Sequence, residues 1–260
     1  MNQKELFDAL LDLDENEVAE VLSMNHSKPK APFISSLIQN KTPYSQGKTG
    51  TCWLSSALLC ISLYLKNVKG IEISEESAFS KSYLLFYDKM ERTKRFLSLI
   101  DSNINNEQRM RYVLNHLMTD RGQWSMAQNL ILKYGLIPYG TMADPFHKIS
   151  SADLNSAINN LLKLYAMHLK KGIASNKKVE MKNNVMNTVR RMLVQLLGEP
   201  PTEIDVPEIF RNTNRMSPQL FFHKYVNFPF DDYLFIGDFA PKTNSFYEVE
   251  FDNNMTDGMP

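Results

Sequence analysis

The chain has 260 residues, 43% of them hydrophobic, and its 29 lysines and arginines balance 29 aspartates and glutamates. This length suffices for one large domain or two small ones, and the balanced charge gives no indication of a nucleic-acid or membrane surface. No apolar run could span a membrane, the first residues lack the apolar core of a signal peptide, and the two cysteines suggest a reducing compartment, so we expect a soluble, cytoplasmic protein.

Helical periodicity dominates the first half of the chain. The segment from Asn25 to Pro43 contains three prolines and is instead predicted to be an extended loop. Ser74, followed by Glu75 and Glu76, is typical of a helix start, because serine caps the first turn and acids favour its positive end. Gly135 is typical of a helix end. We expect helices at residues 5–13, 15–24, 57–65, 74–99, 107–118 and 125–134.

The pattern changes near Ser151, which with Ser150 offers a cap for the first of two long helices. A break after the first helix and Gly198 after the second predict a helical hairpin. A short helix with Pro218 at its first position follows, and then two strands rich in aromatic and β-branched residues. The expected helices cover residues 151–171, 177–197 and 217–225, and the strands cover 233–239 and 245–251.

Two strands at the end of a helical chain cannot bury their faces by themselves. We therefore expect them to be the first strands of an incomplete sheet, as a truncated or split coding region would leave it.

Cys52 follows a polar loop and lies at the predicted N-terminus of the helix that contains residues 57–65, where the helix dipole favours a thiolate. Gln46, six residues earlier, carries a side-chain N–H that can stabilise a developing oxyanion. A small buried residue is the ordinary role of a cysteine, and we assign that role to Cys60, which lies within the apolar run. Gln46, Gly50 and Trp53 favour a nucleophile at Cys52.

Four segments carry a resemblance to a known family: Gly50-Thr51-Cys52-Trp53, Phe79 to Arg92, Asp120 to Met126, and Lys133 to Pro138. In this order and at this spacing, they resemble the bleomycin hydrolase / aminopeptidase C family of papain-like cysteine peptidases. The resemblance begins near Lys41 and weakens after Phe146. It implies an α+β protein with the papain-like fold, consisting of its helical half, a helical-hairpin insertion and an incomplete antiparallel sheet.

The resemblance divides the chain into four expected regions. They are an N-terminal helical and extended arm (1–40), a papain-like helical subdomain with the nucleophile helix (41–147), a helical insertion (148–226) and the first strands of an incomplete barrel half (227–260).

The resemblance also implies an activity and site residues. Members are cytosolic cysteine aminopeptidases, usually homohexamers, that trim peptides without a cofactor. Carried onto this chain, Cys52 is the nucleophile and Gln46 the oxyanion donor, while Gly122, Gln123 and Trp124 bind substrate. A plain core position is an equally good interpretation of Trp124. The scattered cysteines and histidines suggest no tetrahedral metal site.

Two substitutions depart from the family pattern. Arg121 stands where the family usually has a second glycine, and its bulk could narrow the cleft. Ser55 replaces a phenylalanine, which alters packing behind the helix more than chemistry.

The larger departure is the missing base. The family's catalytic asparagine lies in an Asn-Ser-Trp-Gly run, and this sequence contains no such run. His168 and His223 bracket the usual separation of about 130–150 residues from the cysteine, but both lie in helical patterns. We assign surface or boundary roles to them and to His116 and His147, so the chain alone is expected to be inactive or nearly so.

Three hypotheses remain open at this point. The chain is an aminopeptidase completed by a second polypeptide, a non-catalytic scaffold or binding subunit that keeps the family's oligomer contacts, or a truncated product without a stable fold.

Overall fold

The computed structural model describes residues 46, 48–71, 79–143, 150–172, 174–210, 214–230 and 254–255. All of them belong to one unit, Tyr44–Pro260. The predicted helices at 5–13 and 15–24, the predicted loop at 25–43 and the predicted strands at 233–239 and 245–251 lie outside the described residues. Within the described part, no helix is long and apolar enough to cross a membrane.

The described part is mostly helical, as predicted, with one small antiparallel sheet in which Ile204 pairs with Met216. A small sheet beside many helices is consistent with the predicted α+β class. The two short strands and a single turn of 3-10 helix between them had not been predicted. In chain order the elements are α4 (Cys52–Asn67), α5 (Lys81–Asn103), α6 (Glu107–Asn115), α7 (Trp124–Tyr134), α8 (Ser151–Lys170), α9 (Ser175–Leu197), β1 (Ile204–Asp205), η1 (Glu208–Phe210), β2 (Arg215–Met216), α10 (Pro218–Phe221) and the π-helical turn η2 (Phe222–Val226).

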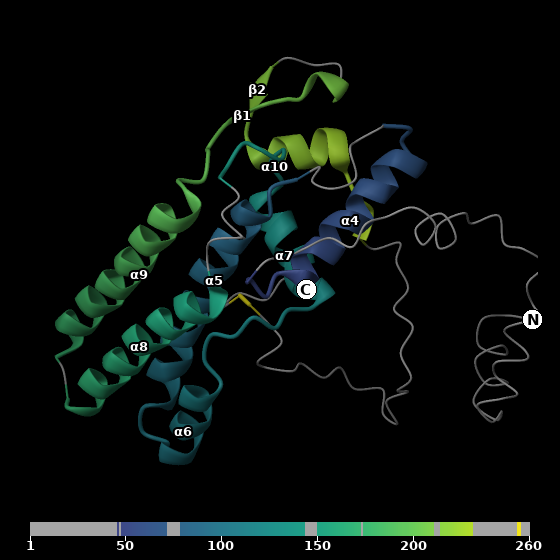
Figure 1. Ribbon diagram of the computed structural model, residues 1–260. Helices are drawn as coiled ribbons and strands as arrows, with labels where there is room; N and C mark the ends of the chain where they lie inside the picture. Colours follow the sequence, from purple (N-terminus) through teal and green to yellow (C-terminus); the bar gives the residue numbers. More distant parts are fainter. Residues whose placement is uncertain are drawn as a thin grey trace, which may run out of the picture. The chain divides into compact units, whose positions relative to one another are not determined.

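Helix α5 is the central element. It packs against α4, α6, α7, α8 and α9, and Figure 1 shows it between the α8–α9 hairpin on one side and α4 and α7 on the other. Most of its apolar residues, among them Leu84, Leu97 and Ile100, are fully or almost fully buried in the common core. A helix covered on most sides would ordinarily be apolar all round, yet α5 also buries several charged side chains.

The prediction that α5 begins at Ser74 was wrong. The helix begins at Lys81, and the cap is Ser80, whose hydroxyl accepts a hydrogen bond from the Tyr83 backbone N–H. The backbone just before it is held in an extended conformation, because Phe79 forms a bridge with Pro138 and the Ser80 N–H donates to the Ile137 carbonyl at 3.0 Å. Serine at position 74 is a residue type that favours a cap, but the pairing of Phe79 with Pro138, which is distant in sequence, sets the start of the helix.

The predicted helical hairpin is confirmed. Ser150 caps α8 by accepting from the Asp153 N–H, and Gly198, at φ 92°, follows the end of α9. Asp101 on α5 holds both helices of the hairpin: it accepts from the Tyr165 hydroxyl at 2.7 Å and forms ion pairs with Lys178 and Lys182 at 3.2 and 2.5 Å. The hairpin is therefore fixed to α5 by a charge as well as by its apolar face.

The predicted helix end at Gly135 and the predicted helix start at Pro218 are also found, whereas α6 ends at Asn115 and not near Met118. Gly135, at φ 76°, follows α7, and Pro218 is the first residue of α10, which Ser217 caps. Gly135 has a second reason to be glycine, because a Cβ there would lie 2.2 Å from the carbonyl oxygen of Pro218.

Candidate active site

Cys52 is the first residue of α4 and its side chain is exposed. The residues around it are less exposed: Thr51 is 1% exposed, Trp53 is half-buried and Leu54 is fully buried. The loop before it is held by its own hydrogen bonds, since the Thr49 hydroxyl donates to the Gln46 carbonyl at 2.7 Å and contacts the Thr51 hydroxyl at 3.1 Å. A fixed loop thus presents one thiol to solvent at the positive end of a sixteen-residue helix.

The segment from Thr119 to Gln123 lies against this loop and helix. A Cβ on Gly122 would lie 2.1 Å from Cδ2 of the Trp53 indole, and a Cβ on Gly50 would lie 2.1 Å from Cβ of Asp120. Such distances are well inside van der Waals contact, so each glycine allows its backbone to approach a side chain that any Cβ would meet. The backbone at Gly122 therefore lies directly beside the residue that follows Cys52.

Ser151 and Asp120 join three parts of the chain near Cys52. The Ser151 hydroxyl accepts from the Gly50 N–H at 3.0 Å and donates to Oδ2 of Asp120 at 2.6 Å. The other oxygen of Asp120 accepts from the Asn155 side chain at 2.7 Å. The N-terminal turn of α8 is thereby linked to the loop that carries Cys52.

Charged residues of α5 lie behind the same segment. Lys89 donates to the Thr119 carbonyl at 3.3 Å and lies 3.7 Å from Oδ1 of Asp120, and burial lowers the pKa of its ammonium group. Arg92 donates from Nη2 to the Arg121 carbonyl at 2.6 Å. The side chains of Asp88, Lys89 and Arg92 are 5% exposed or less. A buried ionic cluster therefore holds the segment from its inner side.

The five residues predicted for the site are distributed as follows. Cys52 and Gly122 are brought to neighbouring positions through Trp53. Gln46 is half-buried, and within the described part its Oε1 is buried without a hydrogen-bond partner. Its role as oxyanion donor stays a prediction.

Gln123 and Trp124 occupy the start of α7. Gln123 is exposed, holds the N-cap position and makes no side-chain capping bond. The Trp124 ring is partly buried and lies 5.9 and 5.8 Å from the rings of Phe228 and Phe230. This packing favours the core role for Trp124, and substrate binding by either residue stays a prediction.

The three described histidines all interact with their own helices. Nδ1 of His116 and Nδ1 of His168 each lie 2.8 Å from the backbone carbonyl four residues earlier, and His223 is exposed with its ring 5.2 Å from that of Phe222. The surface or boundary roles predicted for them are confirmed. His26 and His147 lie outside the described residues.

The core role predicted for Cys60 was wrong, because its side chain is exposed. The residue lies in a helix whose other apolar side chains are largely buried, but its own position on the helix faces outward. Partial desolvation nevertheless raises the pKa of its thiol. The residues described here contain no group of carboxylate, histidine and cysteine side chains that could hold a metal ion.

Sequence reasoning missed the ionic cluster on α5. The signal was present, because Asp88 and Arg92 stand four residues apart within a run of apolar and aromatic residues that must be buried. Its partners Asp120, Ser151 and Asn155 lie far apart in sequence, and only the fold brings them together.

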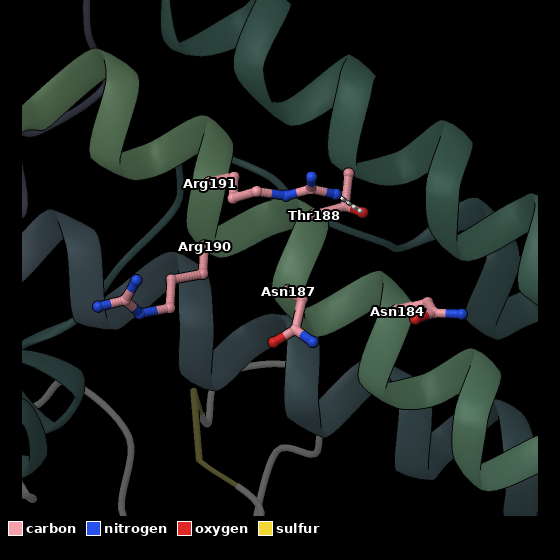
Figure 2. Close-up of a pocket in the computed structure, with 5 residues that line it drawn as sticks. All are labelled: Asn184, Asn187, Thr188, Arg190 and Arg191. Atoms are coloured by element: carbon pink, nitrogen blue, oxygen red, sulfur yellow. Dashed lines mark hydrogen bonds between the residues drawn. The ribbon is translucent and has the colours of Figure 1, made fainter.

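A separate surface hollow lies on α9. Its described lining consists of Asn184, Asn187, Thr188, Arg190 and Arg191 (Figure 2). Arg190 and Arg191 point in different directions; Arg190 is paired with Glu199, and Arg191 donates to the Thr188 hydroxyl at 3.3 Å. This lining contains none of the predicted site residues.

Comparison with known proteins gives consistent relatives. The model of the Peptidase C1-like family matches residues 6–260. The chain is 29% identical over 241 residues to an aminopeptidase C of Listeria innocua, a match that covers 88% of this chain and 54% of that protein. It is 28% identical over 239 residues to a bleomycin hydrolase of Oryctolagus cuniculus, covering 85% of each sequence.

A solved structure has a similar fold. PepW from Lactobacillus rhamnosis superposes with a TM-score of 0.60 at 24% identity, covering 89% of this chain and 57% of that one. The chain thus spans about half the length of most of the curated relatives it matches, including the aminopeptidase C of Listeria innocua.

Proposed function

Because this chain belongs to the Peptidase C1-like family, we propose that it contributes the nucleophile half of a cysteine-type aminopeptidase. The observation that carries the proposal is an exposed thiol at the first residue of α4, placed beside the backbone of Gly122 by the packing of Trp53. The relatives named as aminopeptidases support the reaction class.

In the proposed reaction, the Cys52 thiolate attacks the carbonyl carbon of the first peptide bond of a short peptide. The carbonyl oxygen becomes an oxyanion, which the Cys52 backbone N–H and the side-chain amide of Gln46 stabilise by hydrogen bonds. The carbon–nitrogen bond then breaks and the amine leaves with a proton, while the acyl group stays on sulfur until water hydrolyses the thioester. The backbone around Gly122 positions the peptide.

The proton for the leaving amine requires a base and acid, normally a histidine. No described histidine has a recorded contact with Cys52; those at 116, 168 and 223 interact with their own helices. We therefore propose that the 260-residue chain binds peptides beside Cys52 but does not hydrolyse them by itself. Loss of a base from such a site removes most of the rate enhancement.

The test compares two reagents with the same reactive group. One is iodoacetamide, and the other is a dipeptide with a free N-terminus and an iodoacetamide group at its C-terminal end. We expect the dipeptide reagent to alkylate Cys52 with saturation and much faster than iodoacetamide does, as measured by peptide mapping with mass spectrometry. Cys60, the second exposed thiol of this chain, provides an internal comparison because it should react with both reagents without saturation.

Equal, unsaturated labelling of Cys52 and Cys60 by the dipeptide reagent would show that no peptide site exists. Turnover is measured separately with an amino acid arylamide. Hydrolysis above that of a Cys52→Ser variant would contradict the proposal that the chain lacks a catalytic base. Saturable labelling without hydrolysis also fits a second candidate function, a peptide-binding subunit that does not catalyse. Restored hydrolysis on addition of a histidine-bearing partner chain would favour the peptidase over that second candidate.

A further inference from the structure

Three charged side chains on two consecutive turns of α5 are almost completely removed from water. The exposed fractions of the side chains are 1% for Asp88, 2% for Lys89 and 5% for Arg92. Burying charges costs several kcal/mol per ion, and well-packed apolar residues in the place of a buried ion pair often stabilise a protein as much or more. Stability alone is therefore a weak explanation of these buried charges, and their positions suggest another role.

Arg92 contacts the neighbours of two residues of the candidate active site, Cys52 and Gly122. Its Nη2 donates to the carbonyl of Arg121, the residue before Gly122, at 2.6 Å. Its guanidinium carbon lies 5.9 Å from the ring centroid of Trp53, the residue after Cys52. One side chain thus reaches the nucleophile helix and the backbone that we propose to bind the peptide.

Asp88 fixes the direction of the Arg92 guanidinium. Nε of Arg92 donates to both carboxylate oxygens of Asp88, at 2.8 and 3.0 Å. Asp88 in turn accepts from the side-chain amide of Asn254 at 3.3 Å, and that amide also donates to the Met126 carbonyl at 3.2 Å. The guanidinium is therefore held by Asp88 through Nε while its Nη2 bonds the Arg121 carbonyl.

We propose that Arg92, oriented by Asp88, is a positioning residue that sets the distance between Cys52 and the peptide-binding backbone at Gly122. The proposal rests on the proposed function, since it concerns the same site. Arg92 touches no reacting atom; it acts through the Arg121 carbonyl on one side and the Trp53 ring on the other.

This role requires an arginine. Its Nε and Nη2 belong to one rigid plane, so the bond to Asp88 fixes the bond to Arg121. A lysine keeps the buried positive charge opposite Asp88 but presents a single nitrogen on a flexible stem, so it cannot hold both partners in a fixed relation. Arg92→Lys therefore separates charge compensation from positioning.

The experiment measures the ratio of two alkylation rates at Cys52, that of the dipeptide iodoacetamide reagent divided by that of iodoacetamide. In Arg92→Lys and in Asp88→Asn we expect this ratio to fall roughly ten- to hundredfold, the size that loss of one charge-assisted hydrogen bond implies. The rate with iodoacetamide alone should change by no more than about threefold, because the helix terminus that presents Cys52 is unchanged.

Glu91→Gln is the matched control. Glu91 is a neighbouring buried charge on the same helix. It pairs with Lys133 at 2.8 Å and accepts from the Tyr134 hydroxyl, and both partners are on α7 rather than in the segment 119–122. It should destabilise the chain without changing the ratio.

A ratio unchanged from wild type in folded Arg92→Lys or Asp88→Asn would overturn the proposal, as would an equal fall in Glu91→Gln. Failure of both variants to fold, judged by circular dichroism, would show a structural role instead. A wild-type chain with no preference for the dipeptide reagent would already refute the proposed function itself, so the two failures are distinguishable.

Discussion

Gly122 packs against the indole of Trp53 so closely that a Cβ on residue 122 would lie 2.1 Å from Cδ2 of that ring. The centroid of the same indole ring lies 5.9 Å from the guanidinium carbon of Arg92. The Trp53 ring therefore sets how closely the backbone at Gly122 approaches helix α4, and Arg92 contacts the same ring.

The first prediction concerns this contact. Gly122→Ala should force the segment away from Trp53, because the indole is held by the core and the new methyl group has no space. Overpacking of this kind costs about 1–3 kcal/mol, so we expect the free energy of unfolding in urea to fall by that amount. The dipeptide reagent should also lose its preference for Cys52.

Ser125→Ala is a suitable control for Gly122→Ala, because Ser125 is exposed three residues further along the chain. It should leave both the unfolding curve and the labelling of Cys52 as in wild type. If Gly122→Ala has the same unfolding curve and the same Cys52 labelling as this control, the close packing of Gly122 on Trp53 does not position the peptide.

A second prediction distinguishes two reasons why a position requires glycine, which are a positive φ and a lack of space for a Cβ. Gly135 and Gly140 both have positive φ, 76° and 83°, but a Cβ on Gly135 would lie 2.2 Å from the Pro218 carbonyl oxygen, whereas nothing lies within 4 Å of one on Gly140. Gly140→Ala should cost about 1 kcal/mol from backbone strain alone. Gly135→Ala should cost several kcal/mol, because α10 must also move.

The measurement is again urea unfolding of the two variants beside wild type. Equal losses of stability would mean that α10 adjusts freely to the new methyl group, and the contact between the end of α7 and Pro218 would then not be a fixed one.

Local sequence signals predicted the helices of this chain well where the cause was itself local. Gly135 and Gly198 adopt the positive φ expected after a helix, and Pro218 begins its helix with Ser217 as the cap. Cys52 stands at a helix N-terminus because a polar loop precedes an apolar run, and both features are visible within twenty residues.

The failures have non-local causes. Ser74 resembles a cap, but the bridge between Phe79 and Pro138 keeps the backbone extended directly before Lys81, so that Ser80 becomes the cap. Cys60 lies in an apolar run, but which side of the helix faces outward depends on packing partners distant in sequence.

The candidate site divides in the same way. The motif around Cys52 could be recognised from the sequence, whereas the bond from Arg92 to the Arg121 carbonyl spans 29 positions and the bond from Ser151 to Asp120 spans 31. Contacts between residues so far apart leave no periodic pattern in the sequence, so they could not be predicted from it.

A third prediction concerns the hairpin and pH. Burial raises the pKa of Asp101, but hydrogen bonds from Lys182, Tyr165 and Lys178 outweigh it and hold the pKa below its ordinary value. A carboxylate whose pKa is depressed on folding stabilises the protein above its unfolded pKa, about 3.9, and loses that contribution as pH falls through the folded pKa. Asp101→Asn should therefore destabilise the chain by about 1–3 kcal/mol at pH 7.

The difference between Asp101→Asn and wild type should shrink as the pH falls below about 4. Unfolding curves at pH 7, 5 and 3 test this, with Glu107→Gln as control because its pair with Lys170 is exposed and such pairs contribute little. A difference that stays constant across this range would show that the loss arises from shape and not from the charge.

The last prediction concerns Cys60, whose thiol pKa is raised by desolvation although the side chain is exposed. Only the thiolate reacts with iodoacetamide, so a raised pKa lowers the reactive fraction at any pH below it. In a Cys52→Ser variant, labelling of Cys60 should reach half its maximal rate above about pH 8.5, the ordinary value for cysteine. The same variant unfolded in urea should label faster at pH 8, because unfolding restores the ordinary pKa. A folded profile with its midpoint at or below that of the unfolded chain would contradict the prediction, and it would also remove Cys60 as the slow internal comparison for Cys52.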